Sequence, residues 1–416
     1  MDDRKSLETT RGRNKWISGS ISLVGVLTLS LAWVNCAKKA DSTTASTSPS
    51  ASPSGLAYIY VSNNLTGSDV TGSLSAFTLD SSGTEPVITS IASPSPAPSR
   101  KVHFMSSNAA GNRLYFGEMG AGGNMAGLRV LSIDASTGSL TTLQNREVTD
   151  NTYVLRGVAV AAADNFALFN LSDGSNQYRS LPLVFPSPLA SVTEGSAISP
   201  TLQAFSAVAH PSLKVVYTTN YSTASSASSS HRIIPYSYSD TTGALTARTD
   251  VYSGSFQPRG LAIHKDGGFL VSYHGGIFLS TTYNGIYVFP IDSSGDLGTA
   301  TQATHSLTGN VFDFKFHPTL DVAYALSYST SRVSVFSVNK TAKTLTEVGT
   351  PVTGVTGGYP STMTIDPSGK FLFVVNPGTD NVSVYLINSS TGALTAAATP
   401  TFSVGDNPKA IVIVRP

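Results

Sequence analysis

Four basic residues occupy similar positions in short segments of this 416-residue chain. They are Arg259 in Gln257-Pro258-Arg259-Gly260, Lys409 in Asn407-Pro408-Lys409-Ala410, Arg156 in Leu155-Arg156-Gly157 and Lys101 in Arg100-Lys101-Val102. Cations that converge in a partly dry cleft attract a carboxylate or a phosphate. If the four segments are structurally equivalent, Lys101, Arg156, Arg259 and Lys409 form a binding site for a small anion. The alternative is that they are solvated side chains beside ordinary turns.

Repeated turns indicate which elements must position these cations. The first turn begins with Asp or Asn and contains Gly before Leu, and it recurs at Asp134, Asp240, Asp292 and Asn388. This chemistry is typical of a β-hairpin loop, since Asx residues cap their own turn and Gly adopts positive φ. Weaker copies begin at Asp80 and Asn339, so the starts are about 50 residues apart with one interval doubled, which predicts about seven units in about 360 residues. The missing copy is expected near residue 187.

A second turn follows an apolar run and keeps the same period, at His210-Pro211, His264-Lys265, His317-Pro318 and Asp366-Pro367. Because the three histidines hold a recurring turn position, we interpret them as structural. Four short strands per unit predict an all-β fold, a seven-bladed β-propeller of four-stranded blades. Pro408 to Val414 is expected to pair with the strand beginning at Ala57 and so to close the ring.

The repeats carry a recognisable pattern, best seen in "FLFVVN" (371–376), "VSVYLIN" (382–388) and "TGAL" (391–394). This pattern resembles the seven-bladed lactonase-like propellers, the 6-phosphogluconolactonase-like family. The resemblance is clearest from Phe256 to Pro416 and faint from Tyr153 to Pro200. It implies the fold, but the same architecture serves lactone hydrolysis, cyclisation and binding.

The resemblance also implies catalytic candidates, because lactonase-like enzymes use His, Arg and Glu around the mouth of the channel. His103, Glu118, His274 and Arg259 are the matching residue types on the predicted mouth side. A carboxylate or imidazole would activate water, while arginine would stabilise the oxyanion of the opening ester. No Gly-x-Ser-x-Gly, His-Glu-x-x-His, P-loop or EF-hand motif is present, which disfavours the mechanisms that use them.

The N-terminus has the layout of an export signal. Basic residues precede the apolar run from Ile17 to Val34, and Cys36, the one cysteine of the chain, closes it. We predict a lipoprotein signal over 1–35, a lipidated Cys36 on a Ser/Thr/Pro-rich tether over 36–55, and the propeller over 56–416. The alternative is an uncleaved transmembrane anchor. Either arrangement places the propeller in the cell envelope, facing the periplasm or the exterior.

A net charge of +1 with 12% charged residues argues against a nucleic-acid partner. The first functional hypothesis is a lipid-anchored binding protein for a small anion, a glycan or a protein partner. The alternatives are a lactone hydrolase at the same channel mouth and a structural spacer of the envelope. No cofactor is predicted, and a divalent metal in the channel is left open.

Overall fold

The structure is a computed structural model that describes most of the region expected to form the propeller. The described residues are 56–65, 72–92, 98, 100–119, 125–147, 154–172, 178–184, 193–194, 206–220, 231–252, 258–274, 285–307, 309–353 and 360–416. The predicted signal, Cys36, the tether up to residue 55 and the turn expected near residue 187 lie outside them. No helix among the described residues is long and apolar enough to cross a membrane.

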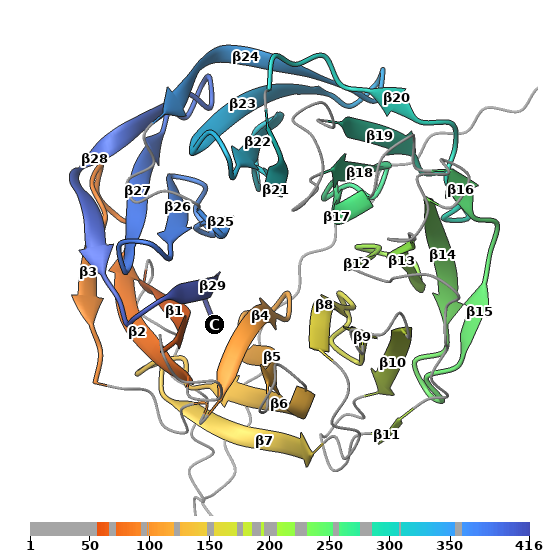
Figure 1. Ribbon diagram of the computed structural model, residues 1–416, viewed down its shortest axis with the longest axis horizontal. Helices are drawn as coiled ribbons and strands as arrows, with labels where there is room; N and C mark the ends of the chain where they lie inside the picture. The colour runs from red at the N-terminus through yellow and green to blue at the C-terminus, as the bar shows by residue number, and fades with distance from the viewer. Residues whose placement is uncertain are drawn as a thin grey trace, which may run out of the picture. The chain divides into compact units, whose positions relative to one another are not determined.

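The described residues form seven antiparallel sheets around a central axis, which confirms the predicted propeller (Figure 1). Blade one contains β29 (Pro408–Val414), β1 (Leu56–Asn64), β2 (Gly72–Asp80) and β3 (Val87–Ser90). Blade two contains β4 (Lys101–Ser107), β5 (Arg113–Met119), β6 (Met125–Ile133) and β7 (Leu140–Glu147). Blade three contains β8 (Val154–Val160), β9 (Phe166–Ser172), β10 (Tyr178–Val184) and β11 (Thr193–Glu194).

The other four blades follow in chain order, each from its innermost strand outward. Blade four contains β12 (Ala207–Ala209), β13 (Val215–Asn220), β14 (Arg232–Tyr238), β15 (Leu245–Ala247) and an additional β16 (Val251–Tyr252). Blade five contains β17 (Pro258–Ile263), β18 (Phe269–His274), β19 (Ile286–Pro290) and β20 (Thr301–Gln302). Blade six contains β21 (Val311–Phe316), β22 (Val322–Ser327), β23 (Arg332–Asn339) and β24 (Thr344–Thr353). Blade seven contains β25 (Thr362–Ile365), β26 (Phe371–Asn376), β27 (Asn381–Ile387) and β28 (Leu394–Ser403).

The last strand of the chain closes the ring, as predicted. β29 pairs antiparallel with β1, with Ile413 opposite Ile59 and Ile411 opposite Val61. This pairing removes the free inner edge that β1 would otherwise present. In Figure 1 the dark blue β29 accordingly lies beside the red β1.

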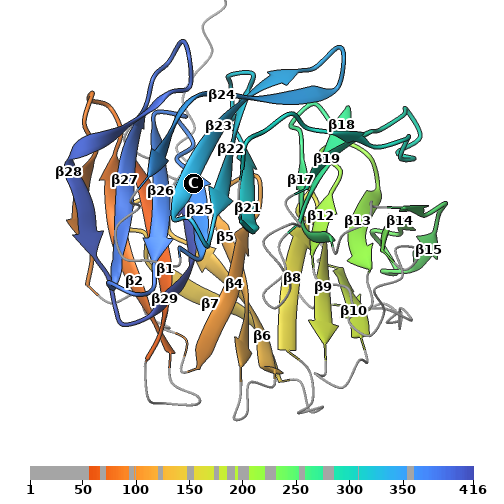
Figure 2. The same cartoon turned by 45° about the horizontal axis from the view of Figure 1, so that its top comes forward.

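Each blade runs from its inner strand through the second and third strands to the outer one, so its connections alternate between two faces (Figure 2). We call the side where the inner strands begin the mouth face and the opposite side the turn face. Both repeated turns lie on the turn face, as expected. Asp134 Oδ1 accepts the Ser136 and Thr137 N–H groups at 2.9 Å, and Gly138 has φ +70°.

Three buried tyrosines connect neighbouring blades at this turn face. Each donates its hydroxyl to the carbonyl of the turn glycine in the next blade. The bonds run from Tyr60 to Gly138 at 2.6 Å, from Tyr217 to Gly295 at 2.9 Å and from Tyr324 to Gly392 at 2.9 Å. We call these residues the inter-blade tyrosines. Their hydroxyls tie blade one to two, four to five and six to seven.

The turn histidines are also structural. His210 Nδ1 accepts the Leu213 N–H at 2.9 Å, and its Nε2 lies 3.1 Å from the carbonyl oxygen of Gly267 in the next blade. His317 repeats this arrangement with Gly369 at 2.8 Å. His264 is 2% exposed and stacks on Phe269 at 4.7 Å. These contacts agree with a role in turn geometry and blade packing.

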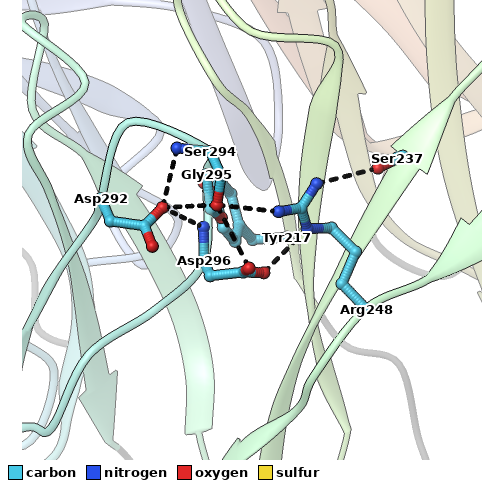
Figure 3. A network of polar contacts seen from close by, with 7 residues as sticks. All are labelled: Tyr217, Ser237, Arg248, Asp292, Ser294, Gly295 and Asp296. Carbon is cyan, nitrogen blue, oxygen red and sulfur yellow. Dashed lines mark hydrogen bonds and ion pairs between the residues drawn. The ribbon is translucent and has the colours of Figure 1, made fainter.

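A charged network adds to the boundary between blades four and five (Figure 3). Arg248 Nε donates to Asp296 Oδ1 at 2.8 Å, and the same guanidinium reaches Ser237 and Ser294, each at 3.1 Å. Asp292 Oδ1 accepts the Ser294 and Asp296 N–H groups at 2.8 and 3.0 Å. The turn between β19 and β20 of blade five is therefore held against blade four.

The outer strand of blade five, β20, is short, because Thr304 leaves blade five and pairs with blade six. Its N–H donates to the Leu345 carbonyl at 3.0 Å, and its carbonyl accepts the Glu347 N–H at 2.9 Å. The outer edge of β24 is thereby covered by the neighbouring blade.

Candidate functional site

A cavity of about 530 Å³ occupies the channel and is lined by all seven inner strands. Its lining includes residues 103–107, 206–208, 311–313, 361–364 and 409–413, together with Gly157, Val158, Arg259, Leu261, Tyr273 and Lys315. A cavity of this size fits a small molecule. A ligand in it would contact several blades at once.

β-Bulges in the inner strands explain why the predicted cations share one position. In β17, Pro258 lies opposite His274 and Gly260 opposite Tyr273, which leaves Arg259 as the extra residue. The same irregularity leaves Lys409 extra in β29 and Arg156 extra in β8. A bulge re-aims a side chain out of the regular ladder. Lys101 differs, because it is paired with Met119 at the start of β4.

The turn before β29 positions Lys409. Asn407 has φ +52°, and its side-chain amide donates to the Asn64 carbonyl at 3.0 Å. Its N–H donates to Asp380 Oδ1 at 2.7 Å. Asn tolerates this left-handed conformation better than most residues. The chain is thereby turned into β29 immediately before the bulge.

Lys409 lies in a half-buried, electropositive environment. Burial lowers the pKa of Lys409, and the positive charge of Lys101 lowers it further. Neither lysine forms a salt bridge with a carboxylate among the described residues. A buried ammonium without a counter-charge is unfavourable, so the pair favours an anionic ligand.

Arg259 enters the cavity from blade five and lies against an aromatic pair. Its Cζ is 5.1 Å from the centroid of the Phe312 ring. Phe312 stacks on Tyr328 with centroids 4.4 Å apart and an interplanar angle of 19°. A guanidinium over an aromatic face is attracted by the ring quadrupole.

Gly260 allows a large side chain to cover the bulge. A Cβ at this position would lie 1.8 Å from the Tyr273 ring, so only glycine is compatible with the observed packing. The pKa of Tyr273 is raised well above its usual value, chiefly by burial and then by the charge of Asp313, to which the hydroxyl is also hydrogen-bonded. Tyr273 therefore remains a neutral hydroxyl in the cavity wall.

The Asp313 carboxylate joins blade six to blade seven through hydrogen bonds. Its Oδ2 accepts the Thr362 hydroxyl at 2.7 Å and the Met363 N–H at 2.9 Å. Its Oδ1 accepts the Phe314 N–H at 2.8 Å and lies 3.0 Å from Lys315 Nζ. With both oxygens occupied, this carboxylate is a structural group and a poor general base.

Two of the four catalytic candidates line the cavity and two do not. His103 and Arg259 line the cavity. Glu118 does not; it is 5% exposed and its Oε2 lies 3.0 Å from Arg129 Nε. His274 is also outside the lining, 1% exposed, with Nε2 3.3 Å from Ser272 Oγ. Glu118 lies near the end of β5 and His274 ends β18, and both are second strands, one inter-strand spacing farther from the channel than the inner strands.

Two of the four predicted anion-binding residues line the cavity. The structure also adds Phe312, which the sequence did not indicate. Lys409 and Arg259 line the cavity, whereas Lys101 lies outside the lining at the start of β4. Arg156 is placed by its backbone in β8. Phe312 holds the bulge of β21, and its alignment with Arg259 in the repeat is the signal that could have identified it. No group of three or more metal-ligating side chains occurs among the described residues.

The described strands and the cavity define a seven-bladed β-propeller with a hollow central channel. Residues 315–412 match the family model "Lactonase, 7-bladed beta-propeller". No curated protein shows significant sequence similarity to the chain.

Solved structures align with most of the chain. A candidate 6-phosphogluconolactonase of Bacteroides fragilis aligns with TM-score 0.66 and 18% identity over 90% of this chain and 100% of that one. The periplasmic gluconolactonase of Pseudomonas aeruginosa aligns with TM-score 0.67 and 16% identity over 86% and 99%. Hydrazine synthase of Kuenenia stuttgartiensis aligns with TM-score 0.53 and 15% identity over 76% and 95%. Because proteins with such different names share the fold, the fold alone does not define a reaction.

Proposed function

We propose that this protein binds a small anion at the mouth of its channel, as a lipoprotein held at the cell envelope through Cys36. The observation that carries the proposal is the half-buried Lys409 beside Lys101, with no salt bridge to a carboxylate in the described part of the chain. An anionic ligand would supply the missing counter-charge. Arg259 adds a second cation to the same cavity from blade five.

The test is isothermal titration calorimetry of the full chain in detergent, with inorganic phosphate and with gluconate as probes. Arg259→Met and Lys409→Met should each weaken binding roughly 10-fold to 100-fold, because each removes a charge-assisted hydrogen bond. Lys214→Met is the matched control, since Lys214 is 63% exposed and pairs with Asp240 at 2.7 Å. Equal affinity in all variants would refute the channel mouth as the site.

Lactone hydrolysis is the second candidate, supported by the family match over 315–412 and by His103 and Arg259 in one cavity. His103 would take a proton from water as the oxygen attacks the lactone carbonyl carbon. Arg259 would pair with the oxyanion; the ring C–O bond would then break, and the proton would pass to the leaving alkoxide. Turnover of gluconolactone that is lost in His103→Gln would favour this reaction, while binding without turnover would favour the first proposal.

A further inference from the structure

Phe312 occupies the bulge position in blade six where blades one, three and five carry cations. The pairing of Val311 with Ser327 and of Asp313 with Leu326 leaves Phe312 as the extra residue of β21. Its neighbours Val311 and Phe314 are 0% and 1% exposed, but Phe312 itself is half-buried and lines the cavity. Phe312 is therefore placed at the channel mouth and outside the core.

The aromatic ring lies between two partners. Tyr328 stacks nearly parallel to it at 4.4 Å and covers one face. The Arg259 guanidinium lies over the ring at 5.1 Å, and we place it on the face that Tyr328 leaves open. The three side chains come from blades five and six, so the stack also joins two blades at the mouth face.

We propose that Phe312 is a positioning residue that holds the Arg259 guanidinium at the channel mouth through its ring quadrupole. The inference rests on the proposed anion site and names a residue that tunes it without contacting the anion. A guanidinium already held in place loses less conformational freedom when it binds a ligand. The anion affinity should therefore follow the electron density of the ring at position 312.

The experiment replaces Phe312 in the full chain with 4-fluoro-, 3,5-difluoro- and 3,4,5-trifluorophenylalanine, which weaken the quadrupole stepwise at nearly constant shape. The dissociation constant for inorganic phosphate should rise stepwise, by roughly 2-fold to 30-fold in total. The same series at Phe316 is the matched control, because that half-buried ring makes T-shaped contacts with the rings of Phe269 and Phe314. Affinity should not change along the control series.

A second comparison separates this inference from the proposed function. In an Arg259→Met background, fluorination at Phe312 should have no further effect on phosphate affinity. If Arg259→Met weakens binding but fluorination does not, the anion site stands and the positioning role is overturned. An equal fluorination effect in both backgrounds also overturns it.

If the wild-type chain binds neither phosphate nor gluconate, the proposed function fails, and nuclear magnetic resonance then tests the stack directly. The Arg259 Nε–H proton should show an upfield ring-current shift that disappears in Phe312→Leu and returns in Phe312→Trp. An unchanged resonance in Phe312→Leu would overturn the inference.

Discussion

Removal of the hydroxyl of an inter-blade tyrosine should lower the free energy of unfolding of the propeller by a measurable amount. Tyr217 is 0% exposed, and its hydroxyl donates to the Gly295 carbonyl at 2.9 Å. Tyr217→Phe keeps the ring packing but leaves a buried carbonyl without this donor. A lost hydrogen bond with an unsatisfied buried partner costs about 1–2 kcal/mol.

The effect should add across blade boundaries. The three inter-blade tyrosines connect different pairs of blades and share no partners, so the triple Tyr→Phe variant should lose roughly 3–6 kcal/mol of unfolding free energy. The assay is urea unfolding followed by far-ultraviolet circular dichroism. This probe suits the protein because Trp16 and Trp33, its two tryptophans, both precede the propeller.

Tyr238→Phe provides the matched control. This residue is 9% exposed and stacks on Phe166 at 4.0 Å, but its hydroxyl has no hydrogen-bond partner in the described part of the chain. Its unfolding free energy should stay within about 0.5 kcal/mol of the wild-type value. A triple variant no less stable than this control would refute the reasoning.

Further outcomes can be stated for pH and for individual side chains. Burial raises the pKa of the inter-blade tyrosines above 10.0 in the folded state, so the unfolded chain loses these protons first. Stability should therefore fall above about pH 10 by up to roughly 1.4 kcal/mol per pH unit per tyrosine, and less steeply in Tyr217→Phe, as measured by urea unfolding. The pKa of Lys409 is lowered, so this lysine should lose its charge below the pH at which an ordinary lysine does. Phosphate affinity measured by calorimetry should therefore decline as the pH rises toward that range, and Lys409→Met should remove this decline. Asp313→Asn should cost about 2–4 kcal/mol in the same unfolding assay, because an amide cannot accept all the bonds of the buried carboxylate; exposed Asp321→Asn should cost less than about 1 kcal/mol. Cys36→Ser should abolish incorporation of labelled palmitate, whereas labelling that persists would contradict lipidation at this residue.

The fold was predictable because its signals are local. A continuous apolar run marks β26, and Asx-Gly turns such as that at Asn388 recur at the period of one blade. The ring closure followed from the same count, since Pro408 to Val414 reads as an inner strand without a blade after it.

The site was less predictable because it depends on register and on lateral position. The repeats place Glu118 and His274 on the mouth side, but they do not reveal that both side chains are buried outside the cavity lining. The sequence alone does not single out Phe312, because an apolar residue in a strand is usually a core residue. The pairing of β21 with β22 shows that it is a bulge residue, at the position that aligns with Arg259 in the repeat.

Ring closure and the candidate site depend on the same strand, β29. The strand that covers the free edge of β1 also carries Lys409, and the six other blades separate it from β1 in the chain. A product that ends before Pro408 would leave the inner edge of β1 unpaired and would lack Lys409, one of the cations in the cavity wall. Ligand binding would consequently report that the ring had closed, and a nonsense mutation before Pro408 would produce a protein that is prone to aggregate and unable to bind the ligand.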